Sequence, residues 1–288
     1  MIRRALAIAV LAACVPASDG EDDPRGAAGA RFIPTATAQG TPFTTADGWT
    51  VTVEHLVLVA RVSAQCSEGG GTGYVAWNAS QETESWAGAL PAAPCVVYAQ
   101  LEGVFTTSGT SLFGRDRPFV EADLPSELVG DVFADPDNQN TIIASTSGVD
   151  FVQGPAISFR LRATRGDETK MLTLRLASSF LSSPEVTRVK QLYVKRDDVV
   201  FARYLVQPER MLVGFDDDLV RFEPLAEADR RGNGDGVIRP DELRRISLND
   251  DADGEVLCSD SIDFITGRCA TLLDVVARNA QRILVLDE

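Results

Sequence analysis

The sequence predicts a mainly β protein, an antiparallel β-sandwich followed by a small helical region at the C-terminus. Apolar and polar residues alternate with a period of two through the middle of the chain, which is typical of strands with one wet face. Clusters of Gly, Pro, Asp and Ser separate these segments, and few helical patterns lie between them. Beyond about residue 222 helical spacing replaces the alternation. We therefore place the sandwich at 41–222 and the helical region at 223–288.

The composition excludes several classes of protein. The chain has 288 residues, with 27 basic and 42 acidic side chains and a formal net charge of -15. A hydrophobic content of 44% rules out disorder throughout. So acidic a surface repels phosphate backbones, which argues against nucleic-acid binding. The single His argues against catalysis that combines a free imidazole with metal-bound imidazoles.

The N-terminus has the pattern of an export signal. Arg3 and Arg4 precede an apolar run over 5–13, which is too short to span a bilayer but fits a signal peptide over 1–13. The run ends in Leu-Ala-Ala-Cys at 11–14, which resembles the lipobox of bacterial lipoproteins. The resemblance implies cleavage before Cys14, acylation of Cys14 and anchoring to the lipid bilayer of the cell envelope. An ordinary secretory signal is the alternative.

The residue after Cys14, Val15, indicates which membrane the lipoprotein would be anchored to. In Gram-negative lipoproteins an Asp at this position retains the protein in the inner membrane, so the resemblance favours the outer membrane. Residues 14–40 are rich in Ala, Gly, Pro, Ser and Asp without periodicity, which predicts a flexible tether after the lipidated Cys14.

The strands of the expected sandwich follow from the alternation. Residues 157–164 and 172–176 alternate most regularly, and 199–206 is evenly apolar, as in a central strand. The segment 67–94 is rich in Gly, Ser and Ala, and we expect a long excursion there. The remaining candidate strands are 49–54, 55–64, 96–104, 141–146, 188–195 and 210–215.

Four cysteines remain after Cys14, as expected of an exported protein with disulfides. Three pairings are possible. We favour Cys66–Cys95 and Cys258–Cys269, because near neighbours lose the least loop-closure entropy. A cysteine metal site is the alternative.

Residues 233–242 read Asn-Gly-Asp-Gly-Val-Ile-Arg-Pro-Asp-Glu, which resembles an EF-hand calcium loop running from Arg231 to Glu242. Calcium prefers six to eight oxygen ligands, and alternate residues of such a loop aim oxygens inward. Arg231 departs from the pattern, because an Asp ligand normally begins the loop; Asp229 is its substitute in a looser loop. The expected calcium ligands are Asp229, Asn233, Asp235, the Val237 carbonyl and Glu242.

The outcome at this loop stays open between weak calcium binding, an EF-hand-like fold without an ion, and an unrelated Asp/Gly turn. An entering helix is expected at 224–230 and an exiting helix after Pro240. Further helical spacing predicts a core-facing helix over 271–283, followed by a strand at 284–286.

A second acidic stretch begins at Asn249. Its spacing fits the same ligand register, but only six residues separate it from Glu242, which is too few for the usual helices. An acidic turn beside a disulfide is the favoured interpretation, since Cys258 falls inside the stretch. Its possible ligands are Asn249, Asp251, Asp253, Glu255 and Asp260.

The favoured function is a non-enzymatic cell-envelope lipoprotein with weak structural calcium binding in the EF-hand-like loop. One alternative is a glycan-binding or adhesion module using Tyr74, Trp77 and Trp86, because exposed aromatic rings can stack on sugars. Another is a hydrolase with a carboxylate pair. His55 is expected to be a packed or rim residue of a strand rather than a ligand.

Overall fold

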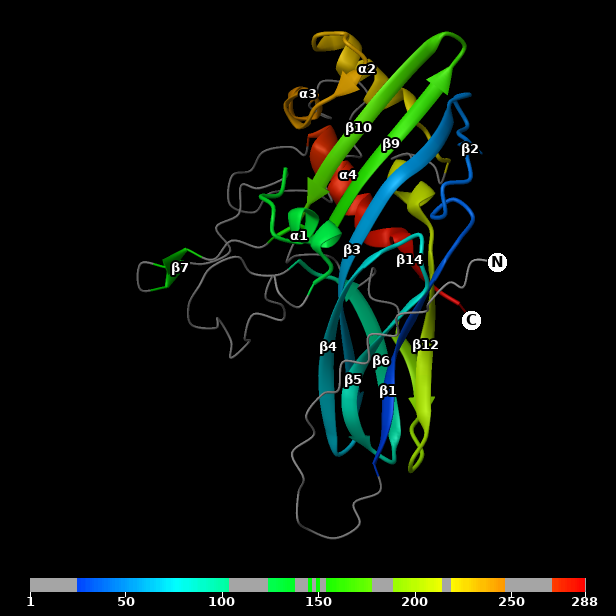
Figure 1. The fold of residues 1–288 in the computed structure, drawn as a ribbon, viewed down its shortest axis with the longest axis vertical. Helices are drawn as coiled ribbons and strands as arrows, with labels where there is room; N and C mark the ends of the chain where they lie inside the picture. Colours follow the sequence, from blue (N-terminus) through cyan, green and yellow to red (C-terminus); the bar gives the residue numbers. More distant parts are fainter. Residues whose placement is uncertain are drawn as a thin grey trace, which may run out of the picture.

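The computed structural model shows a mainly β protein of elongated shape (Figure 1). It describes residues 25–103, 124–137, 145–146, 149–150, 154–177, 189–213, 219–246 and 271–287. The strands are β1 (Arg25–Pro34), β2 (Phe43–Thr44), β3 (Thr50–Cys66), β4 (Gly69–Asn78), β5 (Thr83–Pro91), β6 (Pro94–Leu101), β7 (Ser145–Thr146), β8 (Val149–Asp150), β9 (Ile157–Arg165), β10 (Glu168–Leu176), β11 (Val189–Tyr193), β12 (Val199–Val206), β13 (Val237–Ile238) and β14 (Leu284–Leu286). The helices are α1 (Ser126–Val132), α2 (Glu223–Arg231), α3 (Pro240–Arg245) and α4 (Leu272–Ala280), with 3₁₀ helices η4 (Pro208–Leu212) and η5 (Gln281–Ile283).

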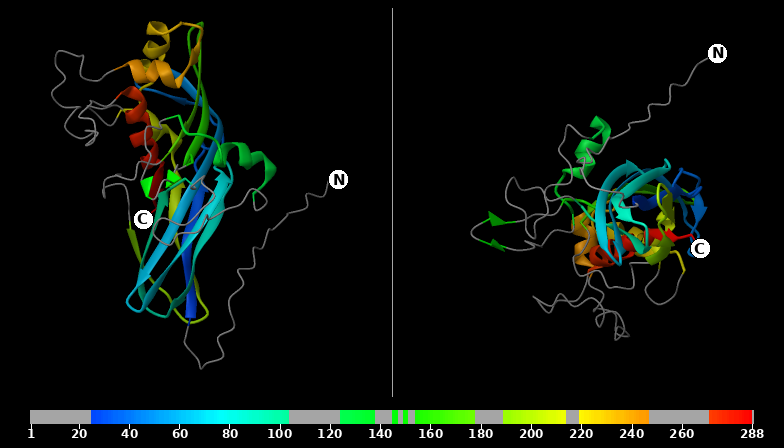
Figure 2. Two further views of the ribbon diagram at one scale, coloured as in Figure 1. Left: turned by 90° about the vertical axis from the view of Figure 1, so that its left-hand side faces the viewer. Right: turned by 90° about the horizontal axis from the view of Figure 1, so that it is seen from below.

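Two sheets make up the body. The smaller has the strand order β14-β12-β1-β5, and the larger follows the path β11-β6-β3-β9-β10-β13, with β2 and β4 also paired to β3. Seen end-on in Figure 2, the strands of the lower half curve around a common interior. Both sheets are mixed, because β1 runs parallel to β12 and β13 runs parallel to β10. The purely antiparallel arrangement predicted above is therefore wrong: these partners are distant in sequence and are not joined by hairpins.

The longest strand, β3, connects the two halves of the body. It pairs with β9 over its first part and with β4 and β6 over its second part. The main core covers one side of β3, while Val57 and Val59 pack on the other side against Leu128 and Val132 of α1. This two-sided burial makes the middle of β3 apolar without alternation, and the sequence candidates 49–54 and 55–64 are parts of one strand.

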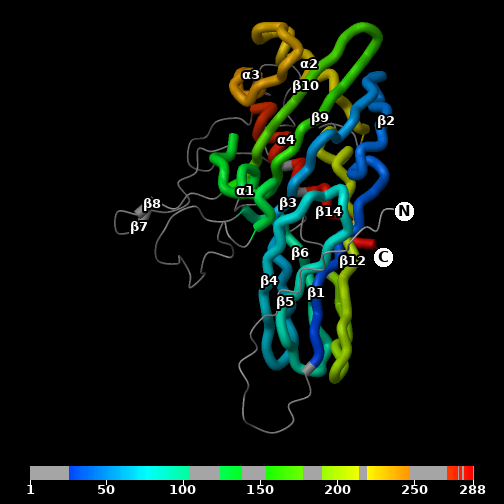
Figure 3. The backbone as a smooth tube through the Cα atoms, viewed as in Figure 1, coloured from blue at the N-terminus to red at the C-terminus, as the bar shows by residue number. Residues whose placement is uncertain are grey.

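The tether prediction is wrong for residues 25–34, which form β1 in the middle of the smaller sheet (Figure 3). Ala28, Ala30 and Phe32 are fully buried. Gly29 has no room for a side chain, since a Cβ there would overlap the Ser85 carbonyl of β5. The small residues that make this segment look like a tether in the sequence allow β1 to pack closely between β12 and β5.

The expected excursion over 67–94 is also wrong, because it contains β4, which forms a hairpin with β3, and β5, which pairs with β1 in the other sheet. Added Cβ atoms at Gly71 and Gly73 would overlap the carbonyl groups of Ala87 and Trp86, so glycine again marks close packing rather than a loop. The candidate strand at 210–215 is wrong for residues 210–212, and residues 214–215 lie outside the described residues. Its first residues belong to η4, which begins at Pro208.

Most of the regular elements are confirmed: β6, β9, β10, β11 and β12 lie where strands are predicted, and α2, α4 and β14 lie at the expected places. At 141–146 only Ser145 and Thr146 are in a described strand. One hydrophobic cluster runs from Ala28 to Leu284 and includes residues of α2 and α4. The described parts of the body and of the C-terminal region therefore share a core across the boundary expected at 222. Within the described ranges, no helix combines the length and apolar composition needed to cross a membrane.

The Cys66–Cys95 disulfide is confirmed and joins the ends of β3 and β6 across a sequence separation of 29 residues. Cys258 and Cys269 lie outside the described residues. Both bonded cysteines lie at the lower end of the body in Figure 1, where β3 turns into β4 and β5 into β6.

We expect the double variant Cys66→Ala/Cys95→Ala to have a free energy of unfolding about 3 kcal/mol lower than that of the wild type. Without the disulfide, the unfolded chain regains the conformational entropy that closing a loop of this length removes. Urea unfolding followed by circular dichroism measures the difference. Each single variant should lose as much as the double variant, since either breaks the same bond. An unchanged unfolding midpoint would contradict the prediction.

Candidate functional site

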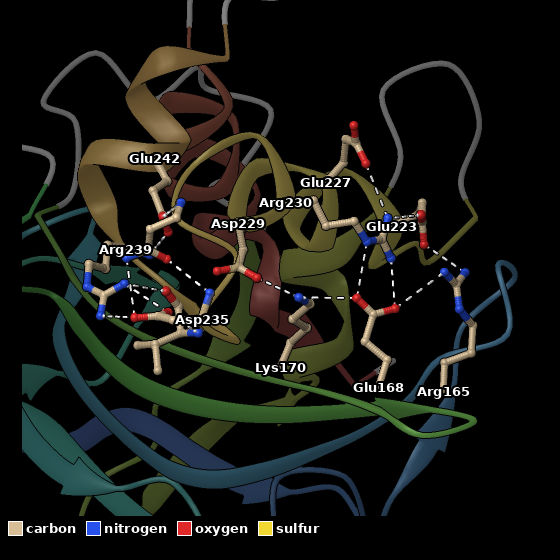
Figure 4. A network of polar contacts seen from close by, with 12 residues as sticks. Arg165, Glu168, Lys170, Glu223, Glu227, Asp229, Arg230, Asp235, Arg239 and Glu242 are labelled. Atoms are coloured by element: carbon tan, nitrogen blue, oxygen red, sulfur yellow. Dashed lines mark hydrogen bonds and ion pairs between the residues drawn. The ribbon is translucent and has the colours of Figure 1, made fainter.

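The loop after α2 is the candidate site, and it lies at the end of the molecule beside the β9–β10 hairpin (Figure 4). The helix α2 precedes it and α3 follows it, each with a Pro in its first turn. Gly234 and Gly236 have φ values of 68° and 85° and make the sharp reversals between the helices. We call α2, the residues 232–239 and α3 the C-terminal cap.

The cap is attached to the sheet by a short strand. β13 runs parallel to β10, with Met171 opposite Val237 and Leu172 opposite Ile238. The Met171 amide also donates to the Gly236 carbonyl at 2.8 Å. Ile238 is buried in the core while Val237 is 42% exposed. The loop is thus held in place by backbone pairing and one apolar anchor.

A buried ion pair makes the second attachment. The Asp229 side chain on α2 has no exposed surface, and its Oδ2 accepts a hydrogen bond from Lys170 Nζ of β10 at 2.5 Å. Burial lowers the pKa of Lys170, but its hydrogen bonds to Asp229 and Glu168 outweigh burial and raise it. Asp229 also accepts the amides of Gly232 and Gly234 at its main-chain carbonyl. Its Oδ1 is buried and has no hydrogen-bond partner among the described residues.

The polar side chains of the loop bind one another. Asn233 donates to Asp235 Oδ2 at 3.2 Å, and the Asp235 amide donates to Asn233 Oδ1 at 3.1 Å. The Arg239 guanidinium donates to both Asp235 oxygens, at 3.0 and 2.7 Å, and to the Val237 carbonyl at 3.1 Å. The pKa of Asp235 falls to about 2, chiefly because of the hydrogen bonds from Arg239.

Glu242 closes the loop from the first turn of α3. Its Oε1 accepts the Asn233 amide at 3.2 Å and its Oε2 accepts the Arg239 amide at 2.9 Å. The second bond is one half of a capping box. Gly232 lies against it, and a Cβ there would overlap the Glu242 carboxylate in its present position.

The five residues predicted to hold calcium lie in α2, the loop after it and α3, and all of the expected ligand oxygens except Asp229 Oδ1 already have protein partners. Lys170 binds Asp229, Arg239 binds Asp235 and Val237, and main-chain amides bind Asn233 and Glu242. Within the described ranges, no three His, Cys, Asp or Glu side chains come together in a way that could hold a metal ion. As the side chains stand, this donor set does not fit calcium, which needs six or more oxygens facing one point.

A network of exposed ion pairs joins the outer side of α2 to the β9–β10 hairpin (Figure 4). Arg230 binds Glu168, Glu223 and Glu227, with nitrogen–oxygen distances of 2.9, 2.6 and 3.2 Å. Hydrogen bonds from Arg230 are also the main cause of the lowered pKa of Glu168. The network therefore fixes α2 on the hairpin from the solvent side.

Glu223 connects this network to the core. It accepts Trp49 Nε1 at 2.9 Å and pairs with Arg165 at 2.7 Å, and the Arg165 guanidinium lies 4.5 Å from the centre of the Trp49 ring. Burial raises the pKa of Glu223, but hydrogen bonds from Arg230, Trp49 and Arg165 outweigh it and lower the pKa to about 2. Glu223 is thus ionised and paired throughout the physiological pH range.

The other predicted site residues lie elsewhere or outside the described ranges. Trp77 is buried at 5% exposure against Phe32, while Trp86 is 40% exposed and packs on Phe201. These two indoles therefore do not form a shared exposed platform for a sugar ring. The residues outside the described ranges are Cys14, Asn249, Asp251, Asp253, Glu255, Cys258, Asp260 and Cys269.

His55, Asp131 and Ser158 form a cluster that the sequence did not reveal. His55 Nε2 lies 2.8 Å from Asp131 Oδ2, and Ser158 Oγ donates to Asp131 Oδ1 at 2.5 Å. A catalytic triad needs the imidazole between the hydroxyl and the carboxylate. Here the carboxylate is in the middle, so the cluster ties α1 to β3 and β9 and does not activate the serine.

Comparison with known proteins adds no family: no protein-family model matches the chain, and neither a curated protein nor a solved structure matches it.

We expect Lys170→Met to reduce the free energy of unfolding by about 3–5 kcal/mol, because it leaves the Asp229 carboxylate buried without its cation. The double variant Lys170→Met/Asp229→Leu should regain most of the loss, since it removes both charges. Chemical unfolding of the three proteins measures this. The control is Lys195→Met, at an exposed turn. A Lys170→Met protein as stable as this control would show that the pair does not hold α2.

Proposed function

We propose that the chain is a non-enzymatic, lipid-anchored protein of the bacterial cell envelope, whose β body stands on the membrane by one end. That end, which we call the tip, contains the start of β1 and the turns β3–β4, β5–β6 and β11–β12 (Figure 1). The observation that carries the proposal is that β1 begins at Arg25 in the tip, so only residues 15–24 separate the body from Cys14.

The short connection limits how far the tip can lie from the lipid. Ten residues span at most about 33–36 Å even when fully extended. The interfacial region on each side of the hydrocarbon core is about 5–8 Å thick. With acyl chains on Cys14, the tip is therefore within reach of the headgroups.

Exposed apolar side chains gather on the strands that reach the tip. Val199 and Trp86 flank β1 opposite Ala27 and Gly29, and they are 50% and 40% exposed. Tyr193, 59% exposed, lies opposite Pro94 at the start of β6. Trp and Tyr are favoured at the level of lipid headgroups, where an apolar ring with a polar edge meets both phases. We assign these side chains to the membrane-facing surface.

The finer architecture belongs to the same proposal. The two sheets pack as a sandwich, supported by core residues from both, such as Phe32 and Tyr204 of the smaller and Leu58 and Phe159 of the larger. The C-terminal cap is an EF-hand-like unit with a structural role at the opposite end of the body from the tip (Figure 1). Calcium binding by this loop stays a prediction from its sequence.

We expect the full chain expressed in a Gram-negative host to incorporate labelled palmitate, because the lipobox directs acylation of Cys14. The Cys14→Ala variant should carry no label and should leave the membrane fraction, as judged by fractionation and autoradiography. Ser18→Ala, in the same segment, is the control and should behave as the wild type. Label that persists in Cys14→Ala would refute the anchor.

We expect bromine-labelled lipids to quench part of the tryptophan fluorescence of the lipidated full chain in vesicles. Trp86 should be the source, because Trp49 and Trp77 are buried. Trp86→Phe should remove the quenching, and adding Val237→Trp at the cap end to this variant should not restore it. Quenching that appears at Val237→Trp instead would show that the body lies the other way round, with the anchor itself intact.

A further inference from the structure

The oxygens that a cation would gather in the 231–242 loop are gathered by Arg239. One guanidinium reaches both oxygens of the Asp235 carboxylate and the main-chain carbonyl of Val237, with all three distances between 2.7 and 3.1 Å. Arg239 lies four residues after Asp235, and its own amide is bound by Glu242. The side chain therefore sits on the same loop whose oxygens it collects.

We propose that Arg239 is the resident cation of this loop, so that the loop closes without a metal ion and a calcium ion can enter only when Arg239 leaves. A bidentate guanidinium–carboxylate pair has both charge and directed hydrogen bonds. Because the cation is part of the chain, its local concentration is fixed by the loop and does not depend on ions in solution.

The charge around the loop supports this assignment. Lys170 neutralises Asp229 from inside, and Arg239 neutralises Asp235 from outside. Arg231, where the resembled loops begin with an acidic ligand, adds a third positive charge and pairs with Glu227. Each of these cations is paired with a carboxylate, so a divalent ion could use the Asp229 or Asp235 charge fully only by displacing its protein partner. Arg239 is the one with an exposed side chain and contacts to two of the expected ligand groups.

The remaining contacts of the loop do not depend on an ion either. Both Glu242 oxygens accept main-chain amides, so this carboxylate is held in place without an ion. The outer side of the loop is paired to β10, and Ile238 is buried. Protein groups thus make these contacts, although the buried Asp229 Oδ1 has no hydrogen-bond partner among the described residues.

The test compares thermal melting of the full chain, purified in mild detergent, in a chelator and in about 5 mM CaCl₂, which exceeds the affinity range of extracellular calcium modules. We expect the wild type to melt at the same temperature in both. Arg239→Gln should melt a few degrees lower than the wild type in chelator, and calcium should restore at least part of the loss. Arg245→Gln is the matched control, because Arg245 forms an exposed pair with a residue four positions earlier, Asp241, and that pair includes none of the expected calcium ligands.

Three results would overturn the proposal. In the first, Arg239→Gln melts like Arg245→Gln in chelator. In the second, calcium stabilises the wild type as much as it stabilises Arg239→Gln. In the third, Arg239→Gln is destabilised and calcium restores nothing, which would make Arg239 an ordinary surface contact. If Arg239→Gln fails to fold, calorimetric titration of the wild type with CaCl₂ decides instead: heat of binding below about 0.1 mM would refute the proposal, and its absence would support it.

Discussion

The position of the C-terminal cap depends on the ion pair between Lys170 and Asp229. A carboxylate with no exposed surface is costly to bury, so α2 can occupy its place only with the Lys170 ammonium beneath it. The same Asp229 binds the Gly232 and Gly234 amides through its main chain and so begins the loop. From there the loop runs into β13, whose pairing with β10 lies next to Lys170 on the same strand. One strand, β10, therefore supplies both the cation and the backbone partner.

The strands that the sequence predicts correctly are those with one face in the core and one in water. In β9 and β10 buried and exposed residues alternate, and the pattern is visible in the sequence. β1 and β4 are not predicted as strands because they contain small residues in place of an alternating pattern. Gly29, Gly71 and Gly73 lie where another backbone passes too close for a Cβ. A Gly-rich segment in close packing has the same composition as a flexible one, and only the neighbouring strand distinguishes them.

Only the local part of the candidate site could be predicted from the sequence. The spacing of Asp235 and Glu242 places both in one tight loop, because that spacing is local. Lys170 could not be found, since it is 59 residues from Asp229 in the sequence and meets it only through the fold. Arg239 could have been found: an Arg four residues after an Asp, in a loop that already lacks an acidic first residue, indicates a cation supplied by the chain.

The two ends of the body are stabilised by different chemistry, and β3 connects them. With 17 residues it is about 56 Å long. At the tip, a disulfide and glycine contacts hold the strands together, which leaves apolar side chains free to face outward. At the cap, ionic pairs hold short helices that are too small to be stable alone. If the tip stands on lipid, the cap projects away from the membrane into water, where its stability should not depend on a particular ion. A loop closed by its own arginine meets that requirement, because the cation cannot be lost to the surroundings.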